Sequence, residues 1–180
     1  MLVGPSGVGK DTVLDGLRAR LSGNSEVRFV QRTVTRPTSA GGEDHLSLTD
    51  AAFTEAELAG AFSVTWRANG LSYGWPAELH GFISEGGIAI ANGSRQALPA
   101  IRAAFPGLLI LAITASEEIL RQRLQARGRE NSAQIEARLA RGRELAVAGP
   151  DVVVVDNGGP AEVAVEKIVA MLEDLRSHGH

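Results

Sequence analysis

The sequence lacks cysteine entirely, and it contains only two lysines and few aromatic residues. Without cysteine the chain has no disulfide framework, no thiol nucleophile and no cysteine-bound metal. No apolar run approaches the ~20 residues that span a membrane, and no signal peptide is apparent, so we expect a cytoplasmic protein without membrane contact. The net charge of −3 gives no general attraction for nucleic acid, so small-molecule substrates are the expected partners.

The length and the order of the apolar segments predict a single α/β domain over residues 1–180. Short apolar runs alternate with helical patterns, which is typical of a parallel sheet covered by helices on both faces. The expected strands are 27–30, 62–66, 88–91, 108–113 and 151–155, and the expected helices are 10–21, 51–58, 76–85, 96–105, 117–127, 133–148 and 161–176. The first apolar run is brief, so either the first strand is short or the chain begins upstream of Met1.

The most informative motif is a glycine-rich loop directly before the first expected helix. It consists of Gly4, Pro5, Ser6, Gly7, Val8, Gly9, Lys10, Asp11 and Thr12. The spacing Gly-x-x-x-x-Gly-Lys lets backbone N–H groups surround the phosphates of a nucleotide, while the lysine reaches the β- and γ-phosphates. The chain has one other lysine, Lys167, so lysine is not its usual solvent-exposed basic residue, and its use in the loop indicates a specific role. The loop predicts binding of ATP or a close analogue, and a plain glycine-rich turn that caps a helix is the alternative.

One residue departs from the usual loop, because Asp11 stands where serine or threonine is expected. A carboxylate beside a polyphosphate is repulsive unless a divalent cation lies between them, and Mg²⁺ accepts carboxylate and water ligands. We therefore expect Asp11 to bind Mg²⁺, directly or through water, with Thr12 as the alternative ligand.

Three further stretches offer groups that grip phosphate oxygens. Arg32 and Arg36 lie on an extended segment before a glycine loop, where surface arginines on an edge strand are the alternative. Tyr73 lies between small residues at 69–74, where a plain hairpin turn is the alternative. Residues 120–129, together with Arg138 on the next helix, form an arginine-rich hinge that suits a closing lid, and a solvated face is the alternative.

Taken together, these motifs resemble the guanylate-kinase branch of the phosphate-loop kinases over nearly the whole chain. The similarity runs from the loop through Thr35-Arg36-Pro37 and Tyr73-Gly74 to the arginine-rich hinge and residues 151–156. Within that branch the closer resemblance is to the ribose 1,5-bisphosphate phosphokinases, through Gly-Lys-Asp-Thr and the segments 41–45, 66–71, 92–95 and 118–131. It implies a three-layer P-loop kinase fold with a small acceptor-binding lobe at about 32–75 and an arginine-rich lid at about 122–143.

The resemblance also implies an activity, which is phosphorylation of ribose 1,5-bisphosphate by ATP and Mg²⁺ at the C1 phosphate. The products are 5-phosphoribosyl 1-diphosphate and ADP, in phosphonate metabolism. The resemblance implies that the catalytic residues are Lys10, Arg36, Arg127 and Arg138, with Arg123 and Arg129 as equal candidates in the lid. It implies that the substrate is bound by Arg32, Arg36, Tyr73, Asn92, Ser94 and Arg95. It also implies that Asn157 lies near the adenine of ATP. A phosphate oxygen needs no general base, so we expect His45 to be a binding or structural residue.

The chain departs from guanylate kinases where those enzymes hold guanine with carboxylates. Residues 64–66 and 91–93 contain no acid, and Ser39 stands where a second phosphate-gripping arginine is expected. A site without the partners of a polar ligand discriminates strongly against it, so we expect guanine recognition to be lost. A nucleoside monophosphate kinase with relaxed base recognition and a non-catalytic guanylate-kinase-like binding module are the alternatives. The sequence leaves the oligomeric state open, a homodimer included.

Overall fold

The computed structural model describes residues 1–37, 44–128, 130–144 and 147–178, and the chain divides into two compact units. The phosphate-loop unit comprises Leu2–Gly23 and Leu109–His180, and the middle unit comprises Met1 and Asn24–Leu108. The glycine-rich loop and the arginine-rich hinge therefore share one unit, while the segments around Arg32, Tyr73 and Arg95 belong to the other.

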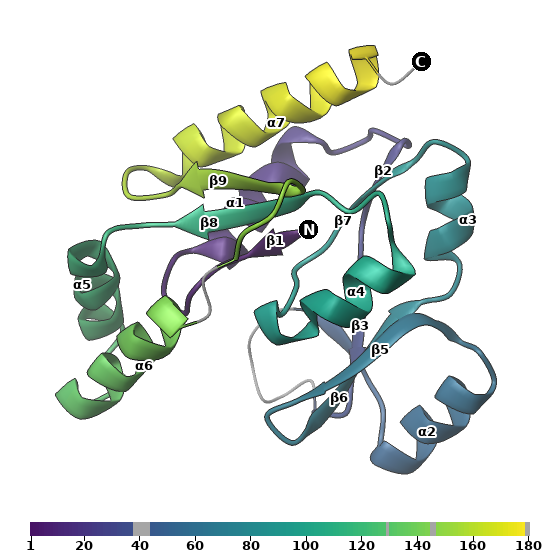
Figure 1. Ribbon diagram of the computed structural model, residues 1–180, viewed down its shortest axis with the longest axis horizontal. Helices are drawn as coiled ribbons and strands as arrows, with labels where there is room; N and C mark the ends of the chain where they lie inside the picture. Colours follow the sequence, from purple (N-terminus) through teal and green to yellow (C-terminus); the bar gives the residue numbers. More distant parts are fainter. Residues whose placement is uncertain (38–43, 129, 145–146, 179–180) are drawn as a thin grey trace. The chain divides into compact units, whose positions relative to one another are not determined.

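The phosphate-loop unit is built on three parallel strands in the order β1-β8-β9 (Figure 1). These are β1 (Leu2–Val3), β8 (Ile110–Thr114) and β9 (Val152–Asp156). The central strand β8 is buried from Ile110 to Ile113, as its continuous apolar run predicts for a parallel strand with neighbours on both sides. Because the strands are parallel, their carboxyl ends meet at one edge, where ligands bind in open α/β sheets.

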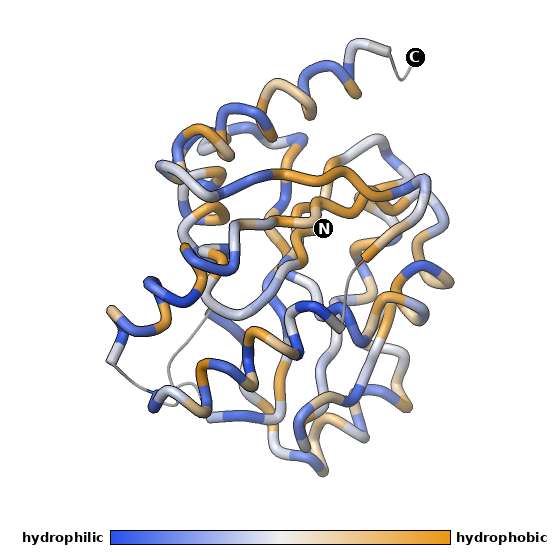
Figure 2. Tube along the Cα trace, turned by 60° about the vertical axis from the view of Figure 1, so that its left-hand side comes forward, coloured by the Kyte–Doolittle hydropathy of each residue, from blue (hydrophilic) through white to orange (hydrophobic). Residues whose placement is uncertain are grey.

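Four helices complete this unit: α1 (Lys10–Arg20), α5 (Glu117–Arg127), α6 (Ser132–Glu144) and α7 (Ala161–His178). Figure 2 shows hydrophilic and hydrophobic residues alternating along α7. Val165 and Ile168 of this helix are buried. A Cβ atom at Gly16 of α1 would lie 2.6 Å from Val165 Cγ2, so glycine allows α1 and α7 to approach closely. Helices α5 and α6 lie against each other.

The predicted ends of α5 are confirmed, and both have a local cause. The hydroxyl of Ser116 accepts a hydrogen bond from the Ile119 N–H at 3.3 Å and begins the helix. Gly128 ends it with a φ of 62°, a left-handed conformation that favours glycine. Helix α6 is described over Ser132–Glu144; of the predicted range to 148, residues 145–146 lie outside the described residues and residues 147–148 are not helical.

The middle unit contains a two-stranded parallel ladder and a four-stranded mixed sheet. Strand β2 (Val27–Phe29) pairs with β7 (Ile88–Ile90), while the mixed sheet has the order β4-β3-β6-β5, with β3 (Arg32–Val34), β4 (His45–Ser47), β5 (Phe62–Ala68) and β6 (Leu71–Pro76). Strands β5 and β6 form an antiparallel hairpin through Asn69 and Gly70, which both have positive φ, as tight hairpin turns require. The sequence predicted the turn but missed β3, β4 and β6.

The helical segments of the middle unit are α2 (Asp50–Leu58), α3 (Leu79–Ser84), η2 (Arg95–Ala97) and α4 (Leu98–Ala104). The predicted start of α3 at Pro76 is wrong, because Pro76 is the last residue of β6. Proline is tolerated at a strand end, where no ladder donor is needed. Within the described residues, no helix has the length and apolar character to cross a bilayer.

Candidate functional site

The glycine-rich loop lies where the three parallel strands end. The loop follows β1, helix α5 follows β8, and Asn157 follows β9, so segments far apart in sequence meet at one edge of the sheet. A Cβ atom at Gly4 would lie 2.5 Å from the Ile113 carbonyl oxygen, so only glycine permits this approach to β8. The position of the loop is therefore determined by packing against β8.

The loop leaves the amino end of α1 open to an anion. Gly9 occupies the N-cap position with a φ of 89°, and no side chain caps the helix. The uncapped N–H groups and the helix dipole favour a negative charge at this end. Lys10 Nζ folds back over the loop, at 2.9 Å from the Gly4 carbonyl oxygen and 3.1 Å from that of Pro5. The arrangement suits the binding of a phosphate group, with the Lys10 ammonium beside the loop.

The candidate metal ligands lie in the first turn of α1. Asp11 and Thr12 are both exposed there. No group of three or more acidic, histidine or cysteine side chains among the described residues could hold a metal ion by itself. These two side chains fit Mg²⁺, because that ion keeps several waters and takes its remaining ligands from substrate phosphates.

Two side chains donate hydrogen bonds to the backbone of the glycine-rich loop. Asn157 is 3% exposed, and its Nδ2 donates to the Val8 carbonyl oxygen at 2.7 Å. Arg123 Nη1 donates to the same oxygen at 3.2 Å, and its Nη2 donates to the Gly159 carbonyl oxygen at 3.4 Å. The structure thus brings Arg123 to the loop backbone.

The predicted lid residue Arg138 reaches the loop from α6. Its Nη1 donates to Ser6 Oγ at 2.6 Å, and its Nη2 forms an ion pair with Glu130 at 2.8 Å. Arg127 is exposed in the last turn of α5. The other candidate, Arg129, lies outside the described residues. Of the predicted lid residues that the structure describes, Arg138 contacts a side chain of the phosphate loop and Arg123 contacts its backbone.

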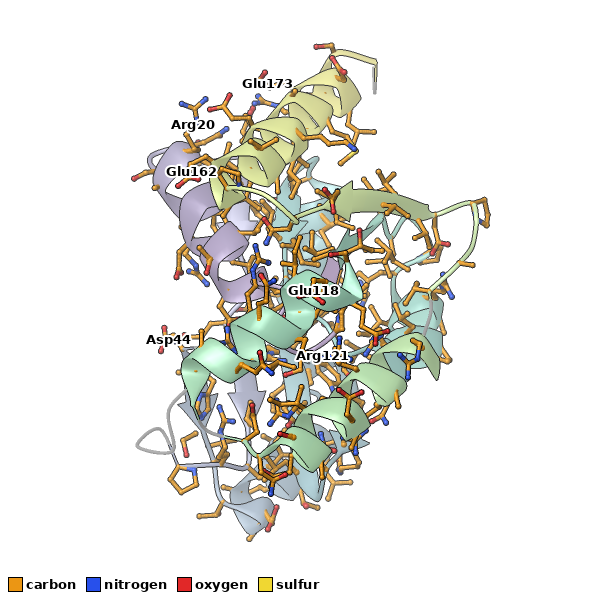
Figure 3. All side chains as sticks on the ribbon, turned by 90° about the vertical axis from the view of Figure 1, so that its left-hand side faces the viewer. Arg20, Asp44, Glu118, Arg121, Glu162 and Glu173 are labelled. Carbon is orange, nitrogen blue, oxygen red and sulfur yellow. The ribbon has the colours of Figure 1, made fainter. Side chains whose placement is uncertain are left out.

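Other charges of the hinge are paired between its two helices. Arg121 of α5, which Figure 3 labels, forms ion pairs with Glu136 of α6 at 3.0 Å and with Glu117 at 3.2 Å. These carboxylates raise the pKa of Arg121. Arg143 also pairs with Glu117, and hydrogen bonding to Arg143 lowers the pKa of that carboxyl. Arg121 and Arg143 therefore form ion pairs that connect α5 with α6, whereas Arg138 contacts the glycine-rich loop.

In the middle unit, the predicted residues Arg32 and Tyr73 come together on the mixed sheet. The Arg32 guanidinium carbon lies 5.7 Å from the centroid of the Tyr73 ring. Tyr73 stacks on Trp66 at 5.3 Å, and Trp66 meets Trp75 edge-on at 5.9 Å. Trp66 and Trp75 are buried, and neither indole N–H has a hydrogen-bond partner within the described residues. Sequence reasoning did not assign a site role to either tryptophan, although apolar alternation on β5 and β6 could have indicated a shared face.

Arg36 follows β3, and its carbonyl oxygen lies 3.1 Å from Nε2 of the buried His45. Since a carbonyl can only accept, the imidazole N–H donates to it. The Arg36 Nε is buried without a partner in the described part of the chain. His45 therefore has a structural role in holding the backbone of Arg36.

The remaining predicted residues lie between β7 and α4. Asn92 is buried, Ser94 is the N-cap residue of η2 and Arg95 begins it. Partial burial of the Arg95 side chain lowers the pKa of its guanidinium. Helix η2 packs against β5.

Strand β1, the glycine-rich loop and the uncapped amino end of α1 together form the arrangement that defines the class of phosphate-loop nucleotide-binding proteins. A family model described as guanylate kinase matches residues 1–175. Among solved structures, guanylate kinase from Anaplasma phagocytophilum superposes with a TM-score of 0.67 over 97% of this chain and 84% of that chain, at 19% identity. A gluconokinase from Sinorhizobium meliloti 1021 gives a TM-score of 0.54 over 99% and 95%, at 18% identity. These likenesses show the fold.

Relatives with higher sequence identity indicate which branch of the guanylate kinase family the chain resembles. Ribose 1,5-bisphosphate phosphokinase PhnN of Rhizobium etli (strain CIAT 652) is 48% identical over 100% of this chain and 91% of its own length. The protein of that name from Agrobacterium fabrum is 45% identical over 96% of this chain and 94% of its own length. The bifunctional ribose 1,5-bisphosphokinase-thymidine phosphorylase of Cupriavidus pinatubonensis is 40% identical over 99% of this chain, which covers 30% of that protein. The chain belongs to the guanylate kinase family and, within it, to the branch of these phosphokinases.

Proposed function

We propose that this protein transfers the γ-phosphoryl group of ATP to the C1 phosphate of ribose 1,5-bisphosphate, giving 5-phosphoribosyl 1-diphosphate and ADP. The observation that carries this proposal is the 48% identity, over the whole chain, to a relative with that activity in its name. We place the acceptor-binding lobe in the middle unit and the lid at 122–143. We also propose a cytoplasmic location.

The nucleotide is bound by the phosphate-loop unit. The N–H groups of residues 4–9 and Lys10 hold the phosphates, and Mg²⁺ bound through Asp11 or Thr12 neutralises part of their charge. Asn157 uses Nδ2 for the loop, while its Oδ1 is buried without a partner in the described residues. That oxygen can accept a hydrogen bond from the amino group of adenine, which supports a place for Asn157 beside the base.

The acceptor is bound by the middle unit. Arg32, Arg36, Tyr73 and Arg95 supply donors, and Asn92 and Ser94 are polar groups for the sugar. The buried groups of this unit without partners in the described residues include the N–H donors of Trp66 and Trp75. Among the described residues of the middle unit, no Asp or Glu is buried. Excess donors suit phosphate and hydroxyl oxygens, whereas guanine would require acceptors.

The chemistry requires positioning and charge neutralisation. A phosphate monoester has a second pKa of roughly 6, so its attacking oxygen is an anion near neutral pH and no general base is needed. Arg36 and Arg95 orient that oxygen, while Arg127 and Arg138 stabilise the charge of the transferred group. In-line transfer by such cations is the general mode of phosphoryl-transfer catalysis.

A coupled assay of ADP release with MgATP tests the proposal. We expect turnover with ribose 1,5-bisphosphate, abolished in Lys10→Ala and retained in the matched control Lys167→Ala, whose side chain is exposed on α7. Phosphorus NMR should show a new diphosphate at C1. Turnover with GMP would instead indicate a nucleoside monophosphate kinase, the alternative that the family model favours. Absence of turnover with both acceptors would indicate a binding module.

A further inference from the structure

One carbonyl of the phosphate loop receives two donors from two distant segments. Asn157 Nδ2 and Arg123 Nη1 both donate to the Val8 oxygen, at 2.7 Å and 3.2 Å. Arg123 comes from α5 and Asn157 follows β9, at 115 and 149 residues from Val8 in sequence. The contact therefore joins three segments at the carboxyl edge of the sheet.

The geometry of the peptide unit gives this contact a consequence for ligand binding. A trans peptide is planar, and its N–H points away from its carbonyl. Fixing the Val8 carbonyl toward Arg123 and Asn157 therefore turns the Gly9 N–H to the opposite side of the loop. Gly9 has a φ of 89° and would otherwise have wide conformational freedom. Its N–H belongs to the uncapped end of α1, where an anion is favoured.

The surroundings show that this contact is specifically built. A Cβ atom at Gly9 would lie 2.8 Å from Asn157 Nδ2 and 3.8 Å from Arg123 Nη1, so glycine is needed for the approach. Asn157 is itself fixed, because its backbone N–H donates to the Thr114 carbonyl oxygen at 2.7 Å. Arg123 is fixed by its second bond, to Gly159.

We propose that Arg123 and Asn157 are positioning residues that hold the Val8–Gly9 peptide plane in the orientation that binds phosphate. Arg123 then acts through the loop backbone, and the lid function belongs to Arg127 and Arg138. This inference rests on the proposed function, since it takes the loop to be the ATP site.

Binding measurements separate positioning from a contact with the base. We would measure the affinity for MgATP, and for magnesium tripolyphosphate by its displacement of MgATP, in Asn157→Ala, Arg123→Lys and the control Arg20→Gln, an exposed arginine at the end of α1 that pairs with Glu166 at 3.5 Å. Loss of the bond to Val8 should weaken tripolyphosphate by about threefold to tenfold in Asn157→Ala, and MgATP by at least that factor, since Asn157 Oδ1 is also proposed to contact the adenine. Arg20→Gln should bind both ligands as the wild type does. Weakening of MgATP with unchanged tripolyphosphate would assign these residues to the adenine and overturn the inference.

A second measurement needs no ligand. The ¹H–¹⁵N heteronuclear NOE of the Gly9 amide should fall in Asn157→Ala and in Arg123→Lys, in folded protein with wild-type thermal unfolding. An unchanged Gly9 signal in both variants would overturn the inference even if the enzyme is fully active. If the wild type binds neither MgATP nor tripolyphosphate, the proposed function fails instead.

Discussion

Arg138 of α6 donates a hydrogen bond to Ser6 Oγ of the phosphate loop at 2.6 Å, across 132 residues of sequence. The same guanidinium pairs with Glu130, whose side chain is 12% exposed. Phosphate oxygens can replace Ser6 and Glu130 as its partners, since arginine grips phosphate with paired N–H groups. Arg138 is therefore placed at the loop before a nucleotide binds.

This relationship predicts opposite effects for the two members of the ion pair. Arg138→Ala should lower kcat by about 10²–10³, the usual loss for one preorganised donor. Glu130→Gln removes the competing charge and should lower the KM for ATP, by about twofold to fivefold, as for a partly exposed ion pair. Steady-state kinetics at fixed Mg²⁺ check both. A raised KM in Glu130→Gln would mean that Glu130 orients Arg138.

Removal of Arg36 should affect the acceptor and leave the nucleotide unchanged. Loss of a charged hydrogen-bond donor costs about 1.5–3 kcal/mol, so Arg36→Ala should raise the KM for ribose 1,5-bisphosphate by about tenfold or more. The matched control is Arg67→Ala, because Arg67 is an exposed arginine of the same unit that pairs with Glu57 at 2.7 Å. An equal rise of the KM for ATP in Arg36→Ala would contradict its assignment to the acceptor.

The dependence on magnesium should reveal the role of Asp11. Asp11→Asn removes the charge and should raise the Mg²⁺ concentration for half-maximal activity by about 10- to 100-fold. Asp11→Ser should restore most of that loss, because a hydroxyl is the usual ligand at this position. Asp15→Asn, an exposed site on the same helix, is the control. Identical Mg²⁺ titrations for wild type and Asp11→Asn would exclude a metal role.

Two glycine substitutions should change stability in opposite directions. Gly16→Ala places a Cβ atom 2.6 Å from Val165 and should lower the free energy of unfolding by about 1–3 kcal/mol. Gly81→Ala lies in α3 with nothing within 4 Å of the new atom, and helix propensity should stabilise it by up to about 1 kcal/mol. Urea unfolding of both variants checks the pair. Equal stabilities would show that α1 and α7 can move apart without cost.

The pH dependence of stability should include a contribution from Glu57. Hydrogen bonds from Arg67 and Thr65 lower the pKa of this carboxyl below its usual 4.5. The stabilisation is therefore present above the unfolded pKa and is lost as the pH falls through the lower folded value. Glu57→Gln should cost about a few tenths of a kcal/mol at pH 7, and this cost should shrink as the pH falls below 4.5. A cost that does not shrink on acidification would assign the effect to packing.

The order of the elements and the phosphate site could be predicted because their causes are local. The helix α5 is bounded by Ser116 and Gly128, and the spacing of Gly4, Gly9 and Lys10 is itself a phosphate-binding motif. The alternation of strand and helix patterns along the chain predicted parallel strands, and the parallel pairing in β1-β8-β9 and β2-β7 confirms that prediction. The strands β3, β4 and β6 were missed because polar residues and glycine interrupt their apolar residues, so pairing with neighbouring strands rather than a continuous apolar run defines them.

The sequence by itself determined the phosphate loop, its lysine and the family of kinases to which the chain belongs. Only the tertiary structure decided which arginine reaches which group: Arg123 the Val8 carbonyl, Arg138 Ser6, and Arg121 a pair of carboxylates. The five arginines between residues 121 and 138 are equivalent as sequence letters. They differ because the helix directions and the parallel order β1-β8-β9 place some beside the loop and others between two helices, and a hydrogen bond forms only where donor and acceptor are in direct contact.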